Sequence, residues 1–135
     1  MTNSICKTAG FGTALLGLWL ASSPAKAEMM LGFSWKGVEG CRGGVVSPSF
    51  VVEGAPASTR TLSFALEMLA AGKVDMVDNE LGGSAVPFPT NGIVPQGAVY
   101  ARAPCNPGQY RWVVVARDAR GLALATARKA NAFPF

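Results

Sequence analysis

Residues 61–68 of the chain read Thr-Leu-Ser-Phe-Ala-Leu-Glu-Met and alternate strictly between large apolar side chains and small or polar ones. Successive side chains of a β-strand point to opposite faces, so a period of two gathers the large apolar residues on one face. That face consists of Leu62, Phe64, Leu66 and Met68, and the opposite face consists of Thr61, Ser63, Ala65 and Glu67. The segment is therefore predicted to be a half-buried strand of an antiparallel sheet.

The same alternation recurs on both sides of this segment, in residues 31–35 and 50–53 before it and in residues 110–116 after it. In the last of these runs Val113 and Val115 make the second face apolar too, which is typical of a central strand covered on both faces. Turn-forming residues separate the runs at 54–56, 82–83, 91–92, 95–97 and 106–108. Short strands at this spacing predict an all-β sandwich in a single small domain.

Two stretches fit more than one structure. Residues 67–77 contain a Leu-Ala-Ala run that fits either a continuing strand or a helical turn. Residues 122–130 are rich in Ala, which favours a short helix, but their first apolar residues also alternate. We interpret this second stretch as the last strand of the domain.

Residues 1–27 are predicted to be a cleavable signal peptide. Lys7 precedes an uncharged apolar run of ~11 residues, which suits a signal sequence and is shorter than the ~20 residues that a membrane-spanning helix needs. Ala25 and Ala27 supply the small side chains that signal peptidase requires before the cut. A buried N-terminal helix is the alternative. Cleavage would leave residues 28–135 as one domain of a periplasmic or secreted protein, without stable insertion in a membrane.

Cleavage would also lower the formal net charge from +4 to +2, because Lys7 and Lys26 are removed. The remaining charge is uneven: residues 28–99 carry four Lys or Arg and seven Asp or Glu, whereas residues 100–135 carry six and one. Antiparallel pairing of the two halves would mix these charges, and a basic face is the alternative. A net charge this small gives no support for nucleic-acid binding.

Two cysteines remain after processing, since Cys6 leaves with the signal peptide. Cys41 and Cys105 form an even pair, which in an oxidising compartment predicts a disulfide closing a loop of roughly 64 residues. Two separate thiols are the alternative. We expect no metal site, because the sequence contains no His and two thiols do not complete a tetrahedral coordination shell.

The absence of His also excludes the Ser-His-Asp and Cys-His arrangements of nucleophilic enzymes. No Gly-rich phosphate loop with its Lys is present either. Glu67 and Glu80 remain as candidates for acid–base chemistry, but scattered carboxylates in a small domain are more often solvated surface groups. We therefore expect neither an enzyme nor a cofactor.

A series of short segments carries a resemblance to a known family. They are Ser47-Pro48-Ser49-Phe50, then Gly54-Ala55-Pro56-Ala57-Ser58-Thr59, Leu62-Ser63-Phe64-Ala65-Leu66, Gly82-Gly83, residues 94–98, 104–107, 110–118 and 121–125. In this order they resemble the bacterial, Raf-kinase-inhibitor-like branch of the phosphatidylethanolamine-binding protein (PEBP) family. The resemblance covers most of residues 31–130. It implies a Greek-key β-sandwich with a small anion pocket near the ends of its strands.

The resemblance is weakest at that pocket, which in the family uses an Asp-Pro-Asp-like turn, a His before a Gly-rich segment, and a Gly-x-His-Arg-Tyr motif. Residues 67–70 correspond to the turn but lack its Pro and keep at most one carboxylate. The first His position falls at or near Glu80. Tyr110 matches the last motif, but Gln109 replaces its Arg and Gly108 its His. Because phosphate needs charge-assisted donors, we expect a degraded anion pocket.

If the pocket persists, the polar side chains expected near it are Glu67, Glu80, Arg102, Tyr110 and Arg111. The alternative for Tyr110 is a core aromatic residue whose hydroxyl is satisfied at the rim. The resemblance implies an exported, non-enzymatic binding or inhibitor-like module for a small polar or anionic ligand, a phospholipid headgroup or a protein partner. The second hypothesis is a structural or interaction protein without a working pocket.

We predict that the mature protein begins at Glu28, since Ala25 and Ala27 meet the requirement of the peptidase for small residues. N-terminal sequencing of periplasmic material checks this. Recovery of the chain from the cytoplasm with Met1 intact would contradict export.

Overall fold

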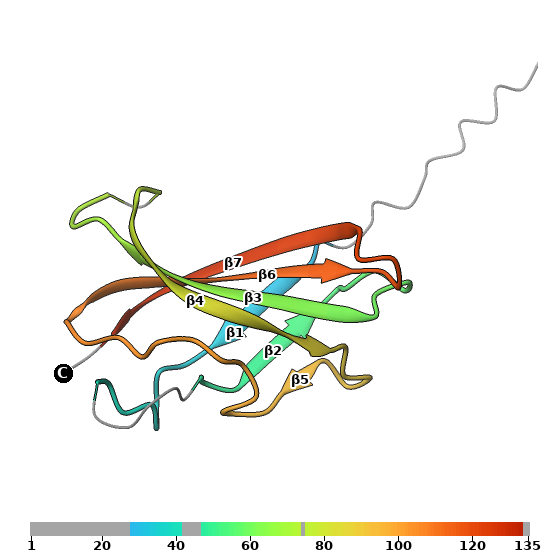
Figure 1. Ribbon diagram of the computed structural model, residues 1–135, viewed down its shortest axis with the longest axis horizontal. Helices are drawn as coiled ribbons and strands as arrows, with labels where there is room; N and C mark the ends of the chain where they lie inside the picture. The colour runs from blue at the N-terminus through green and yellow to red at the C-terminus, as the bar shows by residue number, and fades with distance from the viewer. Residues whose placement is uncertain (1–27, 42–46, 74, 134–135) are drawn as a thin grey trace, which may run out of the picture.

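The computed structural model describes residues 28–41, 47–73 and 75–133, which form two packed antiparallel sheets (Figure 1). The larger sheet has the strand order β4-β3-β6-β7 and the smaller sheet the order β1-β2-β5. The strands are β1 (Met30–Phe33), β2 (Phe50–Glu53), β3 (Thr61–Leu69), β4 (Val77–Pro87), β5 (Ile93–Val94), β6 (Gly108–Arg117) and β7 (Ala123–Phe133). The prediction for residues 1–27 concerns a part of the chain outside the described residues.

The connection from β4 to β6 explains why the chain closes into a sandwich. After β4 the chain leaves the larger sheet, adds β5 to the edge of the smaller sheet, and returns as β6 on the far side of β3 (Figure 1). This crossing between sheets is the connection that a Greek-key arrangement requires. The prediction of an all-β sandwich in one small domain is therefore confirmed.

The core lies where the predicted apolar face of β3 meets the smaller sheet. Leu62, Phe64 and Leu66 are buried there, next to Trp112 of the neighbouring strand β6. Phe50 of β2 packs its ring against those of Phe64 and Trp112, with centroid distances of 4.4 and 5.0 Å. The aromatic side chains of the two sheets thus interlock, which supplies much of the apolar burial that holds the sandwich together.

β6 is a central strand, as its two apolar faces predicted, but its outer face is only half covered. Val113 and Val115 lie on that face, opposite Ala65 and Ser63 of β3. Both valines are partly buried, and within the described ranges no third layer packs over them. The second face of β6 is therefore a solvent-side face of the sandwich.

Of the two ambiguous stretches, residues 67–77 are the end of a strand followed by a turn, and residues 122–130 lie mainly in a strand. β3 continues to Leu69, and a turn containing Gly72 leads into β4, with the Ala70 N–H donating to the Met76 carbonyl at 2.7 Å. Residues 123–133 form β7, paired with β6 along its whole length. No helix is present in the described part of either stretch.

The β6–β7 turn is organised by Asp118. Its Oδ1 accepts hydrogen bonds from the backbone N–H groups of Arg120 and Leu122, at 2.9 and 3.0 Å. Burial acts to raise the pKa of the Asp118 carboxyl, but these two donors and the Arg120 guanidinium outweigh it and hold the pKa below its ordinary value. The carboxylate is thus kept ionised as an acceptor for the turn.

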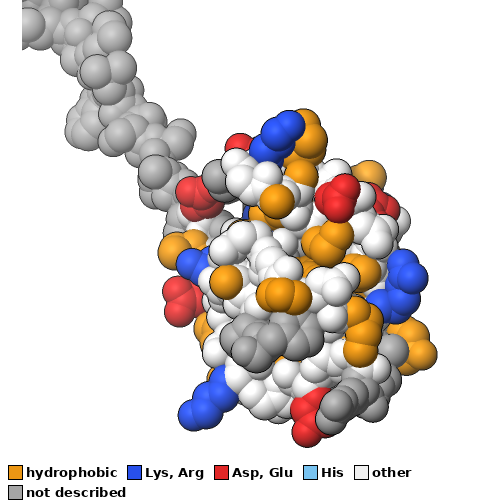
Figure 2. Space-filling view, turned by 90° about the vertical axis from the view of Figure 1, so that its left-hand side faces the viewer, with side chains coloured by type: hydrophobic (Ala, Val, Ile, Leu, Met, Phe, Trp, Pro, Cys, Tyr) orange, Lys and Arg blue, Asp and Glu red, His pale blue; other side chains and the backbone are white. Residues whose placement is uncertain are grey.

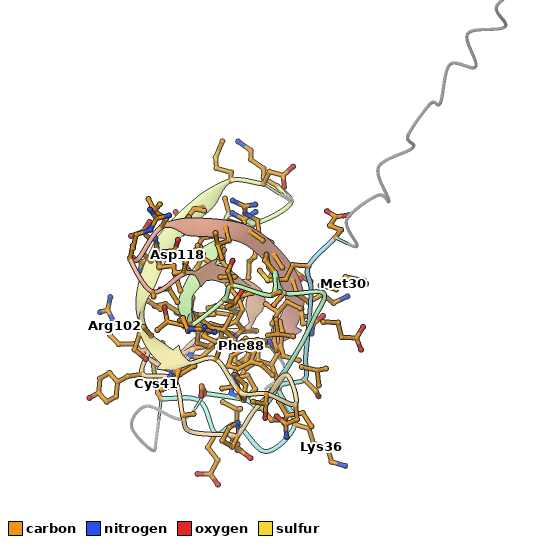
Figure 3. The ribbon with its side chains drawn as sticks, turned by 90° about the vertical axis from the view of Figure 1, so that its right-hand side faces the viewer. Met30, Lys36, Cys41, Phe88, Arg102 and Asp118 are labelled. Carbon is orange, nitrogen blue, oxygen red and sulfur yellow. A yellow bond between two sulfur atoms is a disulfide. The ribbon has the colours of Figure 1, made fainter. Side chains whose placement is uncertain are left out.

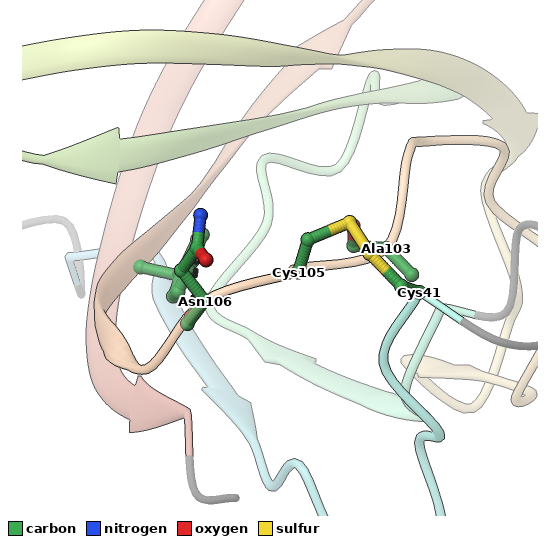
Figure 4. The surroundings of a disulfide bond; sticks show 5 residues. Cys41, Ala103, Cys105 and Asn106 are labelled. Carbon is green, nitrogen blue, oxygen red and sulfur yellow. Dashed lines mark hydrogen bonds between the residues drawn. A yellow bond between two sulfur atoms is a disulfide. The ribbon is translucent and has the colours of Figure 1, made fainter.

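The predicted disulfide between Cys41 and Cys105 is confirmed (Figure 4). It joins the segment that follows β1 to the segment that leads into β6, with the two Cα atoms 4.8 Å apart. Gly40 packs so closely beside this bridge that a Cβ atom there would lie 2.8 Å from the Pro104 carbonyl oxygen. The bridge therefore ties an early segment of the chain to the start of a central strand. Within the described residues no helix has the length and apolar character needed to cross a bilayer.

We expect the double variant Cys41→Ser/Cys105→Ser to be less stable by about 4 kcal/mol, because it restores to the unfolded chain the freedom that a loop of this length loses on cross-linking. Urea unfolding of the oxidised protein and the variant measures the difference. Alkylation of both thiols in denaturant without any reductant would show that the bridge does not form.

Candidate ligand-binding cleft

A cleft of about 1030 Å³ opens at one end of the sandwich, between the β3–β4 hairpin and the paired strands β6 and β7. Figure 2 faces this end of the molecule and shows hydrophobic side chains gathered on it. The lining comes from residues 68–73 of the hairpin, Asp78 of β4, residues 106–109 at the start of β6, and Ala130, Ala132 and Phe133 of β7.

The hairpin wall of the cleft depends on an irregularity near the end of β3. The register between β3 and β4 shifts between Met68 and Leu69, so the strict alternation of β3 ends there. Leu69 is buried at 6 % exposure, and the neighbouring Met68 is also partly buried. Two consecutive apolar side chains therefore contribute to one wall.

The opposite wall is the turn that leads into β6, and it is held at two points. The Cys41–Cys105 bridge fixes its beginning, directly before Asn106 (Figure 4). The hydroxyl of Tyr110 donates a hydrogen bond to the Asn106 carbonyl oxygen at 2.7 Å. Because Tyr110 is itself locked in the core at 1 % exposure, this bond positions the turn relative to the sandwich.

The cleft is apolar inside and polar at its rim. Leu69 and Phe133 are buried, at 6 % and 5 % exposure, whereas all four polar lining residues are exposed. These four are Lys73, Asp78, Asn106 and Gln109. The two charged members have opposite signs, and neither forms an ion pair within the described residues. The nearest polar contact of the Lys73 ammonium is the Met76 sulfur at 3.9 Å.

The five residues predicted to be near a pocket do not line this cleft. Tyr110 points into the core and has its hydroxyl satisfied by Asn106, which is the alternative that the sequence left open for it. Glu80, Glu67 and Arg111 form a row across β4, β3 and β6 on the outer face of the larger sheet. Whether any of them contacts a ligand stays a prediction.

Arg111 and Glu67 form a well-shielded ion pair on that outer face. The Nη2 and Nε atoms of Arg111 lie 2.7 and 2.8 Å from Oε2 of Glu67, and the two side chains are only 14 % and 17 % exposed. Asp75 approaches the same guanidinium at 3.8 Å. The pair joins the acidic half of the domain to the basic half, as expected if antiparallel pairing mixes their charges.

Arg102 lies apart from this pair, along the free edge of β4. Its backbone N–H donates to the Leu81 carbonyl at 2.8 Å, and its Nη2 donates to the Glu80 carbonyl at 3.2 Å. Figure 3 shows its side chain at the periphery of the molecule. Arg102 thus satisfies edge carbonyls of β4 rather than facing the cleft. Within the described ranges, no group of three or more His, Cys, Asp or Glu side chains is placed to hold a metal ion.

The cleft nevertheless falls where the sequence resemblance placed the family pocket. Residues 68–70 and 108–109 line it, and these positions lie in the turn and motif segments of the resemblance. Among the lining residues that the sequence did not indicate are the β7 residues Ala130, Ala132 and Phe133. Small and apolar side chains carry no chemical signature of a site, so only the packing of β7 beside β6 reveals their role.

Comparison with known proteins gives a match in structure but not in sequence. No family model matches the chain, and no curated protein is significantly similar to it. The chain is similar to the crystal structure of a Chlamydia trachomatis protein described as a homologue of phosphatidylethanolamine-binding protein. The TM-score is 0.55 at 15 % sequence identity, over 80 % of this chain and 98 % of the other. At this identity the likeness concerns the fold: the chain has a PEBP-like β-sandwich, as the resemblance implied.

We expect Arg111→Ala to destabilise the protein by about 2 kcal/mol, since it leaves the shielded Glu67 carboxylate opposite Glu80 without its charged donor. Thermal or urea unfolding measures the loss. Arg128→Ala, which removes an exposed cation from β7 of the same sheet, is the control and should change stability by less than about 0.5 kcal/mol. Equal stability of the two variants would show that the ion pair contributes nothing.

Proposed function

We propose that this protein is an exported, non-enzymatic binding module that uses the end cleft of a PEBP-like sandwich and has lost the anion-binding groups of that pocket. The observation that carries the proposal is the position of the cleft. It is formed by the segments at 68–70 and 106–109, where the resemblance places the family pocket, and its volume of about 1030 Å³ is about twice that of the hollows beside Met30 and Trp35. Such a pre-formed concave site is the usual place for a small ligand.

The residues around the cleft support the loss of phosphate binding. Gly108 and Gln109 stand where the family motif has His and Arg, so two charge-assisted donors are missing from the wall. Arg111, the nearest guanidinium along the strand, shares its sheet face with the lining residues Gln109 and Ala130 but is bound to Glu67. Lys73 is the one cation on the described lining, and Asp78 on the same lining opposes it.

The same ion pair supports a non-enzymatic role. Glu67 and Glu80 were the carboxylates with potential for acid–base chemistry, and they lie opposite each other on β3 and β4, on the outer face. Glu67 is held by Arg111 and neither carboxylate lines the cleft. General acid–base catalysis needs the group within hydrogen-bond reach of the substrate, which this arrangement does not offer to a ligand in the cleft.

Export is supported by two independent features. The N-terminal sequence has the pattern of a signal peptide, and Cys41 and Cys105 are joined by a disulfide. Structural disulfides persist in oxidising compartments and are rare in the cytosol of most organisms.

We expect phosphate and phosphoethanolamine to bind poorly in calorimetric titrations. Two missing charge-assisted hydrogen bonds, each contributing roughly 1.5–3 kcal/mol, weaken binding about 150-fold or more relative to a pocket that keeps them. Gln109→Arg returns one donor to the cleft wall, and it should tighten phosphate binding about tenfold.

The matched control is Gln96→Arg, which adds the same charge at an exposed position outside the cleft and should not change phosphate binding. Micromolar phosphate binding by the unmodified protein that disappears in Arg111→Ala would contradict the proposal, because the outer-face guanidinium would then be the anion site.

A further inference from the structure

We infer that the ligand of the cleft is an uncharged, largely apolar small molecule rather than an anion. The inference rests on the proposed function, because it assigns a ligand class to the same cleft. Three features of the described lining carry it: an apolar interior, enough space for a whole small molecule, and a rim whose two charges cancel.

The interior offers apolar contact without a buried polar group. Leu69 and Phe133 are almost fully buried, and Met68 lies beside Leu69 on the hairpin wall. A charged ligand atom that entered this region would lose its hydration without gaining an ionic partner, which is strongly unfavourable. An apolar ligand would instead remove from water its own surface and the exposed apolar surface of lining residues such as Ala132.

Small residues create the space. Ala130 and Ala132 project from β7 into the cleft, and Gly108 adds no side chain to the opposite wall. The resulting volume of about 1030 Å³ matches the upper end of the range for sites that enclose a drug-sized molecule, roughly 300–1,000 Å³. The thioether of Met68 adapts readily to different apolar and aromatic shapes.

The rim sets the charge preference. Lys73 and Asp78 contribute one positive and one negative side chain, so the described lining has no net charge to attract an anion. The amides of Asn106 and Gln109 at the rim are suited to neutral hydrogen-bonding groups of a ligand. The guanidinium of Arg111 lies beside the lining residue Ala130 on the same face of the larger sheet, but it is committed to Glu67.

Two fluorescent probes with a shared ring system test this directly. N-phenyl-1-naphthylamine is uncharged, and 8-anilinonaphthalene-1-sulfonate carries the same aromatic body with a negative charge. Both probes are titrated into the folded, oxidised protein, and the binding measured with Ala132→Leu, a variant that fills the cleft, is subtracted. The neutral probe should bind saturably and at least about tenfold more tightly than the sulfonate.

The variants place the probe in the cleft. Ala132→Glu puts a carboxylate in the lining and should weaken the neutral probe at least tenfold, and Ala132→Leu should weaken it by occupying space without adding charge. Ala85→Glu, at an exposed position on β4 outside the cleft, is the matched control and should bind as the unmodified protein does. Asp78→Asn should tighten the sulfonate several-fold and leave the neutral probe unchanged.

The outcomes separate the ligand class from the proposed function. Tighter binding of the sulfonate that is lost in Lys73→Gln would overturn the inference while leaving the cleft as a binding site. Absence of binding by both probes would count against the binding function itself. Equal binding of the neutral probe to the Ala132→Glu and unmodified proteins would place the probe elsewhere and overturn the inference.

Discussion

β3 and β6 pair so that Leu66 lies opposite Trp112 on the inner face and Glu67 lies opposite Arg111 on the outer face. One further step along the strands, Met68 lies opposite Tyr110 at the end of the sheet where the cleft begins. A shift of one residue in this register would carry the core residues to the solvent side and the ion pair into the interior. The core, the ion pair and one wall of the cleft therefore depend on a single antiparallel pairing, which the surrounding strands and the disulfide reinforce.

Much of the fold follows from local patterns in the sequence. The alternation in residues 61–68 and 110–116 predicts two strands because the side-chain period of a strand is a local property, and both strands are present. The cover expected on the second face of residues 110–116 was wrong, because no other layer of the described residues packs over that face. The cysteine count predicts the bridge because only Cys41 and Cys105 remain after the predicted cleavage, so they have one way to pair. The Ala-rich last strand and the turn after β3 were ambiguous, since the first depends on pairing with β6 and the second on a register shift beside Leu69.

The site was harder to predict because the sequence draws attention to polar residues. Arg111 is a natural candidate for an anion, yet its partner Glu67 lies 44 residues away and becomes its neighbour only through the β3–β6 register. Tyr110 belongs to a recognisable motif, and its ring serves the core while its hydroxyl supports the cleft wall. The lining itself is made of small and apolar residues such as Ala132, whose position on β7 decides their role. The chain thus has a PEBP-like fold, and the changed chemistry of its pocket is our proposal.

The claim that the end cleft, and not the adjacent Glu67–Arg111 ion pair, binds the ligand is tested most directly by nuclear magnetic resonance. Backbone and methyl chemical shifts of the oxidised protein would be followed during titration with N-phenyl-1-naphthylamine. The account predicts the largest changes at Leu69, Gln109 and Ala132, on the three walls of the cleft. Changes centred on Glu67 and Arg111, with the cleft signals unmoved, would contradict it.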